Sequence, residues 1–373
     1  MKRKKRILFG AVDIGYRIEL YTKFIDENLS DKLKAESFSK YVLPEEHYKT
    51  NYTYTCPIDK THPLLIYLYC FGFFIFSLFR YDIFHFLSGE TILTRKLRRF
   101  ELATYKLFGK RVIMHFVGSD IRSNEYLNWK EKNILKFLEG QDDYPKSEPW
   151  QKKLIRDAEK FADSILVSTP DLLELIPTAA YFPVMLDLEK FIFELNETKT
   201  SQTEKNEVVI LFCPSSTKVN FKGTNYVKDI LKKISANPKY NIKIILPAEN
   251  KIEGSTDYPV SRYELFQLFN QADIVIDQMI IGWYGLLSVE ALSAQTQTIC
   301  YVDKKLEHFL FTNCPINLAD VNTLETVIIK CVERVQNKQT DELKKQIEWI
   351  KSYHVIENNN DALLKAWNLN HSE

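Results

Sequence analysis

The 373-residue sequence predicts an α/β fold with parallel sheets, and three observations support this prediction. Apolar runs of strand length alternate along the chain with helical stretches, as in βαβ units. The runs are continuously apolar, which is typical of parallel strands buried on both faces. Hydrophobic residues make up 45% of the chain, enough apolar surface for two well-packed domains.

The order of these segments gives a domain plan. Predicted strands cover 6–12, 81–87, 111–117, 164–169, 207–213, 241–247, 272–277 and 296–302, and predicted helices include 148–162, 224–235, 263–271 and the segments after 340. A polar stretch over 196–207 separates two strand-helix series, as a linker would. We therefore predict an N-terminal Rossmann-like domain over 1–190, a linker over 191–206, a C-terminal one over 207–350 and a final helix over 351–373.

Charge and cysteine content exclude several functional classes. The formal net charge is +1 and no basic stripe is interleaved with aromatic residues, so we expect no nucleic-acid partner. The six cysteines are scattered and form no C-x-x-C pair, which indicates reduced thiols in a cytoplasmic protein. The first apolar run is too short for a signal peptide. Because no His, Cys, Asp or Glu set has metal-ligand spacing, we expect no metal.

The segment 64–79 contains sixteen residues without a charge. A helix that spans a membrane needs about 20 apolar residues, so this run is short for a span. Two alternatives stay open. The segment either packs inside its domain or rests on a bilayer interface, in which case the protein contacts the inner face of the membrane peripherally.

The glycines after the seventh predicted strand suggest a phosphate site. Gly282 and Gly285 precede an apolar helix whose first N–H groups belong to Gly285, Leu286 and Leu287. Free amides and the helix dipole together favour a phosphate group at this position. Glu290, near the second turn, could accept hydrogen bonds from sugar hydroxyls. The alternatives are ordinary turn glycines and a surface acid that the dipole stabilises.

The loop after the fifth predicted strand carries a second candidate site. It contains Ser215, Ser216, Lys218, Lys222 and Gly223, and a helix follows. Two cations beside a helix N-terminus would neutralise a diphosphate, whereas solvated loop lysines are the alternative. The loop lacks the G-x-x-x-x-G-K-[ST] pattern of a P-loop.

A third group of polar residues ends the strand at 111–117. His115, Gly118, Ser119, Asp120 and Arg122 lie close together in the sequence. A His near an Asp at a strand end could orient a substrate hydroxyl or move a proton. The alternative is a structural salt bridge between Asp120 and Arg122 beside a helix cap.

Four segments together resemble the bacterial retaining glycosyltransferases of family four, which have the GT-B fold. They are HFVGSDIR, STPDLLELIPTAAYFPVMLDLEKF, FKGT and ADIVIDQMIIGWYGLLSVEALSA, and the resemblance extends from about residue 5 to about residue 350. It implies two Rossmann-like domains with parallel sheets that face an inter-domain cleft. The C-terminal domain would hold the nucleotide sugar and the N-terminal domain the acceptor, and the final helix would cross back onto the N-terminal domain.

The resemblance also assigns roles to residues. Lys222 and the amides of 285–287 would bind the donor diphosphate, Glu290 the ribose, and Gly10 and Gly15 would lie near the phosphates or the acceptor. His115 and Asp120 fall in the loop that faces the reacting sugar, so His115, Asp120, Lys222 and Glu290 are the expected catalytic residues. Four positions depart from the family pattern: Gly282 replaces an acid, Val117 replaces a histidine, AQTQ at 294–297 replaces an Ala-x-Gly-x-Pro turn, and Lys218 lies near the usual arginine.

The expected activity is therefore transfer of a hexose from a nucleotide diphosphate sugar, a UDP-sugar, to a hydroxyl of a glycan or lipid-linked glycan in surface polysaccharide biosynthesis. No cofactor is expected beside this co-substrate. Gly282 and Val117 motivate an alternative hypothesis, a non-catalytic GT-B protein that binds a nucleotide sugar or a partner glycosyltransferase.

Overall fold

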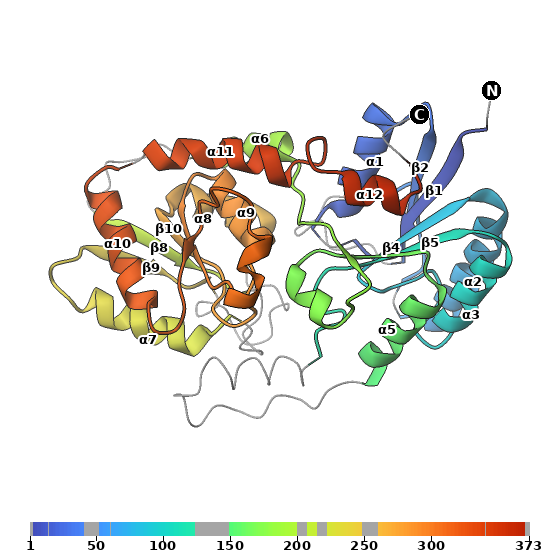
Figure 1. Ribbon diagram of the computed structural model, residues 1–373, viewed down its shortest axis with the longest axis horizontal. Coiled ribbons are helices and arrows are strands. Elements are labelled where there is room, and N and C mark those ends of the chain that lie inside the picture. Colours follow the sequence, from blue (N-terminus) through green and yellow to red (C-terminus); the bar gives the residue numbers. More distant parts are fainter. Residues whose placement is uncertain are drawn as a thin grey trace. The chain divides into compact units, whose positions relative to one another are not determined.

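The computed structural model describes residues 3–13, 15–40, 52–59, 61–123, 149–199, 207–214, 222–247, 260–339 and 341–369. The chain divides into two compact units (Figure 1). Unit 1 comprises 1–123, 147–183 and 360–373, and unit 2 comprises 124–146 and 184–359. The borders expected from the sequence, 190 and 350, lie about seven and nine residues from these positions. The expected linker over 191–206 begins inside a helix, Leu188–Glu197, and the expected final helix over 351–373 is replaced by two helices, Asp341–His354 and Asp361–Ala366.

Unit 1 is built on a seven-stranded parallel sheet of order β3-β2-β1-β4-β5-β6-β7. Its strands are β1 (Lys5–Gly10), β2 (Leu33–Ser39), β3 (Tyr54–Thr55), β4 (Ile83–Leu87), β5 (Arg111–Phe116), β6 (Ser164–Val167) and β7 (Ala180–Tyr181). In the centre Ile7 of β1 pairs with both Ala35 and Ile83. The central strands are buried on both faces, as their continuous apolar runs predict.

Helices cover both faces of this sheet. They are α1 (Arg17–Asn28), α2 (Pro63–Arg80), α3 (Arg98–Leu107), α5 (Pro149–Phe161), a 3₁₀ helix (Pro170–Glu174) and α12 (Asp361–Ala366). One core layer joins alternate strand residues such as Phe84 and Met114 to α2, α3 and α5. On the other face Phe9 packs against Tyr21 of α1 and against Trp367, directly after α12.

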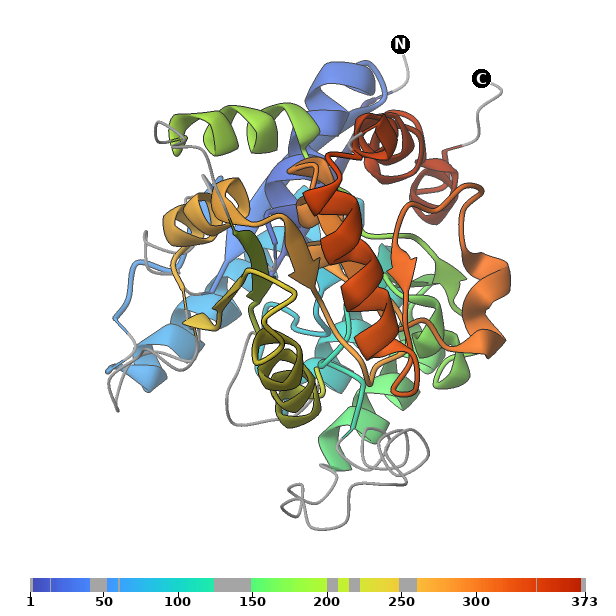
Figure 2. The ribbon, with the colours of Figure 1, turned by 90° about the vertical axis from the view of Figure 1, so that its left-hand side faces the viewer.

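Unit 2 contains a five-stranded parallel sheet of order β12-β11-β10-β8-β9. Its strands are β8 (Val208–Phe212), β9 (Ile242–Ile245), β10 (Ile274–Ile276), β11 (Gln297–Cys300) and β12 (Asn317–Leu318). The helices are α6 (Leu188–Glu197), α7 (Thr224–Ser235), α8 (Arg262–Gln271), α9 (Leu286–Ser293), the 3₁₀ helix Lys304–Phe309, α10 (Leu324–Gln336) and α11 (Asp341–His354). Figure 2 shows α7 and α10 side by side on one face of this sheet, where they close a single core cluster.

The topology of unit 2 defines where a ligand can approach. From β8 the chain passes through α7 to β9 at one edge, and then returns through α8 to β10 on the other side of β8. The strand order therefore reverses between β8 and β10. In open parallel sheets such a switch point leaves a crevice beyond the carboxyl ends of the two strands.

The last helix belongs to unit 1, although α11 before it belongs to unit 2. Arg111 Nε of β5 donates to the carbonyl of Ala366 at 2.6 Å. Trp367 is fully buried, and its Nε1 donates to His85 Nδ1 at 3.1 Å. A buried indole and a capped helix end thus anchor the C-terminal segment to the unit 1 sheet.

Candidate functional site

Lys222 lies at the switch point of unit 2. Its Nζ is 2.7 Å from Oδ1 of Asp277, the residue after β10, and 3.5 Å from the carbonyl oxygen of Cys213, the residue after β8. The carbonyl of Lys222 also accepts a hydrogen bond from the N–H of Met279 at 3.2 Å. One lysine therefore connects the carboxyl ends of both strands, and 15% of its side chain stays exposed.

Asp277 holds this lysine and the start of α9 in one network. Its Oδ2 accepts hydrogen bonds from Ser288 Oγ at 2.7 Å and from the N–H of Gly285 at 3.3 Å. Burial by itself would raise the pKa of Asp277. The Lys222 ammonium and the hydrogen bonds outweigh burial, so the pKa lies below its ordinary value. Asp277 is therefore a carboxylate that fixes the position of the lysine.

The N-terminus of α9 adjoins this ion pair. Gly285 is the N-cap residue and makes no side-chain cap, while Leu286 and Leu287 are half-buried in the first turn. N–H groups in a first turn have no intrahelical acceptor, and they lie at the positive end of the helix dipole. The amides of Leu286 and Leu287 therefore lie near Lys222, which is bound to the same Asp277 carboxylate as Gly285, and anion binding at this position stays a prediction.

Gly285 has no conformational need to be glycine. Its φ of −114° and ψ of −164° are extended backbone. Among the described atoms, a Cβ built on Gly285 would meet only Asp277 Oδ2, at 3.8 Å. The fold therefore accepts a side chain here, whereas a ligand lying close to the backbone would not.

Gly282 and Gly223 have structural reasons to be glycine. Gly282 has φ +88°, and Gly223 has φ +72° as the N-cap of α7. A Cβ on Gly223 would also lie 3.3 Å from Met279 Cβ. The two glycines are explained by their left-handed backbone, a conformation that L side chains rarely adopt.

Gln278 organises the loop between β10 and α9, and sequence reasoning missed it. Its Oε1 accepts hydrogen bonds from three successive amides, those of Ile280 at 3.0 Å, Ile281 at 2.7 Å and Gly282 at 3.4 Å. Its Nε2 donates to the carbonyl of Trp283 at 2.6 Å. The sequence signal is a glutamine two residues after a strand and before a glycine-containing loop, but the direction of its side chain, which the sequence does not give, decides its role.

Glu290 is buried and paired. Arg262 Nη1 at the start of α8 lies 2.6 Å from Glu290 Oε1, and 2% of Glu290 is exposed. Burial raises the pKa of Glu290 and the nearby Asp277 carboxylate adds to the increase, while Arg262 partly offsets both. The Arg262 guanidinium lies 4.5 Å from the ring centroid of Phe266. Arg262 is a second residue that sequence reasoning missed, and it belongs to the candidate site through its contact with Glu290.

Three residues of the expected donor site cannot be placed. Ser215, Ser216 and Lys218 lie outside the described residues. Lys222, Gly223, Gly282, Glu290 and the 285–287 amides all belong to unit 2, around the switch point.

The loop after β5 in unit 1 is fixed by Asp120. Its carboxylate accepts hydrogen bonds from the amides of Val117 at 2.9 Å, Gly118 at 2.7 Å and Ile121 at 3.1 Å. Burial raises the pKa of Asp120, and these backbone hydrogen bonds offset part of the increase. Ser119 is exposed at the tip of this loop. Asp120 therefore shapes the loop through its backbone.

Arg122 forms a bidentate pair with Asp171 of the 3₁₀ helix, at 2.7 and 2.9 Å. Its Nη2 also donates to Thr169 Oγ1 at 2.7 Å. Gly118 has φ +149°, and a Cβ there would lie 2.5 Å from Arg122 Nη1. The strong partner of this arginine is thus the segment after β6, 49 residues away, rather than the neighbouring aspartate that the sequence suggested.

His115 belongs to a buried chain of hydrogen bonds on the α1 and α12 face of the sheet. Trp367 Nε1 donates to His85 Nδ1, which leaves the proton of His85 on Nε2, 3.4 Å from His115 Nδ1. His115 Nε2 then lies 3.0 Å from Ser168 Oγ, which also accepts a hydrogen bond from Arg17 Nη1 at 2.7 Å. Both histidines are fully buried, and burial lowers their pKa values, that of His85 to about 3.

If both histidines are neutral, each ring has one donor and one acceptor nitrogen, and the hydrogen bonds run in one direction from Trp367 through His85 and His115 to Ser168. Every ring nitrogen of the two histidines then has a partner. The structure therefore gives His115 a place in the core, and its catalytic role stays a prediction. Gly10 ends β1, and Gly15, with φ +70°, lies just before α1. Both glycines lie in unit 1, like His115 and Asp120.

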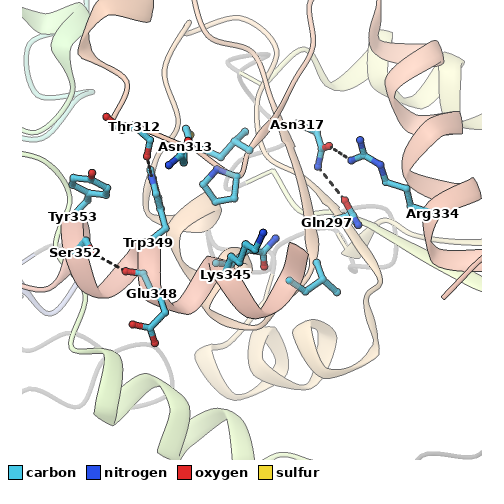
Figure 3. A pocket seen from close by; sticks show the side chains of 15 residues that line it. Gln297, Thr312, Asn313, Asn317, Arg334, Lys345, Glu348, Trp349, Ser352 and Tyr353 are labelled. Atoms are coloured by element: carbon cyan, nitrogen blue, oxygen red, sulfur yellow. Dashed lines mark hydrogen bonds between the residues drawn. The ribbon is translucent and has the colours of Figure 1, made fainter. Parts of the chain in front are cut away.

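A separate pocket of about 720 Å³ lies in unit 2 beside α11 (Figure 3). It adjoins Gln297 and Asn317, at the amino ends of β11 and β12, whereas the switch point lies at the carboxyl ends. Asn317 Nδ2 donates to Gln297 Oε1, and Asn317 Oδ1 accepts a hydrogen bond from Arg334 Nη1. Trp349 Nε1 donates to the carbonyl of Thr312. None of its described lining residues is a site residue expected from the sequence.

Solved structures match the chain over almost its whole length. Sucrose-phosphate synthase from Thermosynechococcus elongatus is 12% identical, with 98% of each chain covered and a TM-score of 0.60. Anabaena HepE in complex with UDP-glucose is 12% identical, with 98% of this chain and 100% of that chain covered and a TM-score of 0.59. The chain has the GT-B fold. The fold expected from the sequence is thereby confirmed.

The GT-B fold also occurs in an enzyme of another class. UDP-GlcNAc 2-epimerase from Methanocaldococcus jannaschii is 11% identical, with 98% of this chain and 99% of that chain covered and a TM-score of 0.50. No protein-family model matches the chain, and the search of curated proteins finds no match. Identities near 12% establish the GT-B fold alone, so the activity has to be argued from the site.

Proposed function

We propose that the chain is a retaining glycosyltransferase that moves a hexose from a UDP-sugar to a hydroxyl of a glycan or lipid-linked glycan. One observation carries the proposal: Lys222 is fixed on Asp277 at the switch point, beside the N-terminus of α9. This arrangement suits a diphosphate, because it combines a cation with helix amides. HepE, of the same fold, has been solved with UDP-glucose, which supports the choice of donor.

The chemistry follows from these charges. The bond between the donor sugar's anomeric carbon and the diphosphate oxygen breaks, and the acceptor oxygen bonds to the same carbon on the same face. The acceptor proton passes to the leaving diphosphate. Lys222 and the amides of Leu286 and Leu287 would stabilise the negative charge that develops on that diphosphate. We propose that this lysine and these amides supply the neutralising charge without a metal.

Further roles extend the proposal to both units. Glu290, oriented by Arg262, would accept hydrogen bonds from the ribose hydroxyls. The loop with Ser119 at its tip would contact the acceptor. We further propose a cytoplasmic protein that acts in surface polysaccharide biosynthesis, since glycan assembly consumes nucleotide sugars.

Incubation with a panel of UDP-sugars and glycan acceptors tests the proposal. We expect UDP release that depends on acceptor and persists in EDTA, and a product that keeps the anomeric configuration of the donor by NMR. Lys222→Ala should abolish turnover, and the exposed Lys232→Ala on α7 serves as the matched control. Inverted product would refute the retaining mechanism, and release of a 2-epimerised sugar would instead indicate an epimerase.

The second candidate function is a non-catalytic GT-B protein that binds a nucleotide sugar or a partner glycosyltransferase. The observation that favours it is Gly282, which stands where the similar family has an acid and whose φ of +88° suits glycine. Binding of UDP-sugars without turnover or donor hydrolysis across the panel would support this candidate over the enzyme.

A further inference from the structure

Helix α2 has two apolar faces, and within the part of the chain that the structure describes one of them is covered and the other is exposed. Ile66, Phe73 and Leu78 are among the residues that pack against the unit 1 sheet. The opposite face is exposed, with Leu68 61% and Phe79 75% accessible. Among the described residues, α2 has the length and hydropathy of a membrane-crossing helix, although 33% of it is buried.

Helix α3 continues this exposed surface. The rings of Phe74 and Phe100 lie 6.1 Å apart, and so do those of Phe79 and Phe108, so the two helices are adjacent. Large exposed side chains of the two helices and their flanking turns form what we term the α2–α3 apolar face. Its members are Leu64, Leu65, Tyr67, Leu68, Phe71, Ile75, Phe76, Phe79, Leu97, Phe100, Leu107 and Phe108. A contiguous apolar surface of this kind marks an interaction site.

Cations border the α2–α3 apolar face. Helix α5 packs beside α3, where Lys106 Nζ donates to the carbonyl of Lys160 at 3.4 Å. On α3, the turn before it and α5, the exposed cations are Arg95, Lys96, Arg99, Lys106, Lys152, Lys153, Arg156 and Lys160. Across the same described segments the exposed acid is Glu159, and Arg95 is paired with Glu90 at 2.7 Å. The border is therefore strongly basic, although the whole chain has a net charge of +1. Figure 1 shows these three helices together on one side of the unit 1 sheet.

We propose that the α2–α3 apolar face docks onto an anionic lipid bilayer, with α2 lying in the plane of the interface. An apolar helix face enters the boundary between headgroups and acyl chains, and basic side chains at its border attract anionic headgroups. A spanning role for α2 conflicts with its packing, because Phe73, Phe74 and Leu78 belong to the core of unit 1. A second copy fits less well, because both surfaces would carry the same basic border and neither would supply an anionic partner for it.

Co-sedimentation of the full chain with vesicles tests this proposal. We expect binding to vesicles of phosphatidylcholine mixed with phosphatidylglycerol, about tenfold tighter than to phosphatidylcholine alone and weakened by salt. The double variant Leu68→Glu with Phe79→Glu should lose binding. Phe193→Glu, at a position 65% exposed on α6 of unit 2, should bind like the wild type. Lys152→Ala with Lys153→Ala should reduce the preference for phosphatidylglycerol, whereas Lys232→Ala should not.

Three results would overturn the proposal. The wild type could stay in the supernatant with anionic vesicles, or the Phe193→Glu control could lose binding as much as the double variant does. The third result is a concentration-dependent dimer in ultracentrifugation that the double variant Leu68→Glu with Phe79→Glu dissociates. Thermal unfolding of each variant confirms that it is folded. If the double variant unfolds, the single variant Leu107→Glu, at a position 83% exposed, replaces it. The docking proposal does not depend on the proposed activity, because UDP binding in unit 2 should be unchanged in these variants.

Discussion

The contact between Lys222 and Asp277 predicts a double-mutant cycle in which the two single substitutions lower the free energy of unfolding by different amounts. Lys222→Ala leaves a carboxylate that is 4% exposed without its cation, whereas Asp277→Asn leaves an ammonium that is 15% exposed. Removing one partner of a buried ion pair costs about 3–5 kcal/mol, and partial exposure of the lysine favours the lower end of that range. We therefore expect Lys222→Ala to lower the free energy of unfolding by about 3 kcal/mol and Asp277→Asn to lower it by less.

Chemical denaturation and thermal unfolding at neutral pH measure this cycle. For a unit of about 200 residues, 3 kcal/mol corresponds to a Tm decrease of roughly 6–12 °C. The double variant should be more stable than the sum of the single effects predicts, with a coupling energy of about 1–3 kcal/mol. The surface control Lys232→Ala should change stability by less than about 0.5 kcal/mol. Single effects that add within about 0.5 kcal/mol would refute the ion pair.

Three further predictions follow from the buried polar groups and the glycines. Trp367→Phe leaves His85 Nδ1 buried without a hydrogen-bond donor, so the free energy of unfolding should fall by about 1–3 kcal/mol and amide hydrogen exchange in α12 should become faster. Unchanged exchange would contradict the role of Trp367 in anchoring the C-terminal segment. His354 is also buried and neutral, its pKa lowered to about 4 by burial, so the unfolded chain binds protons that the folded chain refuses. The free energy of unfolding should therefore fall as the pH drops below about 6.5, by up to about 1.4 kcal/mol per pH unit for each such histidine. A free energy of unfolding that stays constant from pH 7 to pH 5 in urea titrations would contradict the burial of neutral histidines. Gly282→Ala should lower the free energy of unfolding by about 1–2 kcal/mol because the backbone of Gly282 is left-handed, whereas Gly285→Ala should fold normally but bind UDP more weakly. Equal unfolding curves for the two variants would contradict this difference between the two glycines.

Much of the fold was predictable because parallel strands buried on both faces have continuous apolar sequences. All eight expected strands are present in the structure. The strand β2 was missed because Glu36 interrupts its apolar pattern. Arg6, Arg80 and Tyr81 contact this carboxylate, and such tertiary partners are invisible in a local window. The strands β3, β7 and β12 have two residues each, too few for a period to show.

The candidate site was partly predictable for a related reason. Glycines and lysines at the ends of apolar runs indicate loops at the carboxyl edge of a sheet, and this placed Lys222 and Gly285 together. The partner of Lys222 could not be predicted, because Asp277 is 55 residues away and sheet order alone brings it near. The same holds for Arg262 beside Glu290. His85 and Trp367, 282 residues apart, meet only because the last helix returns to unit 1.

The central claim is that Lys222 and the α9 N-terminus form a diphosphate site. Calorimetric titration of UDP into the wild type, Lys222→Ala and the Lys232→Ala control tests it most directly. We predict micromolar binding to the wild type and the control, weakened about tenfold or more in Lys222→Ala, which corresponds to about 1.4 kcal/mol. Equal affinity in all three proteins, or no binding of UDP at millimolar concentration, would contradict the claim.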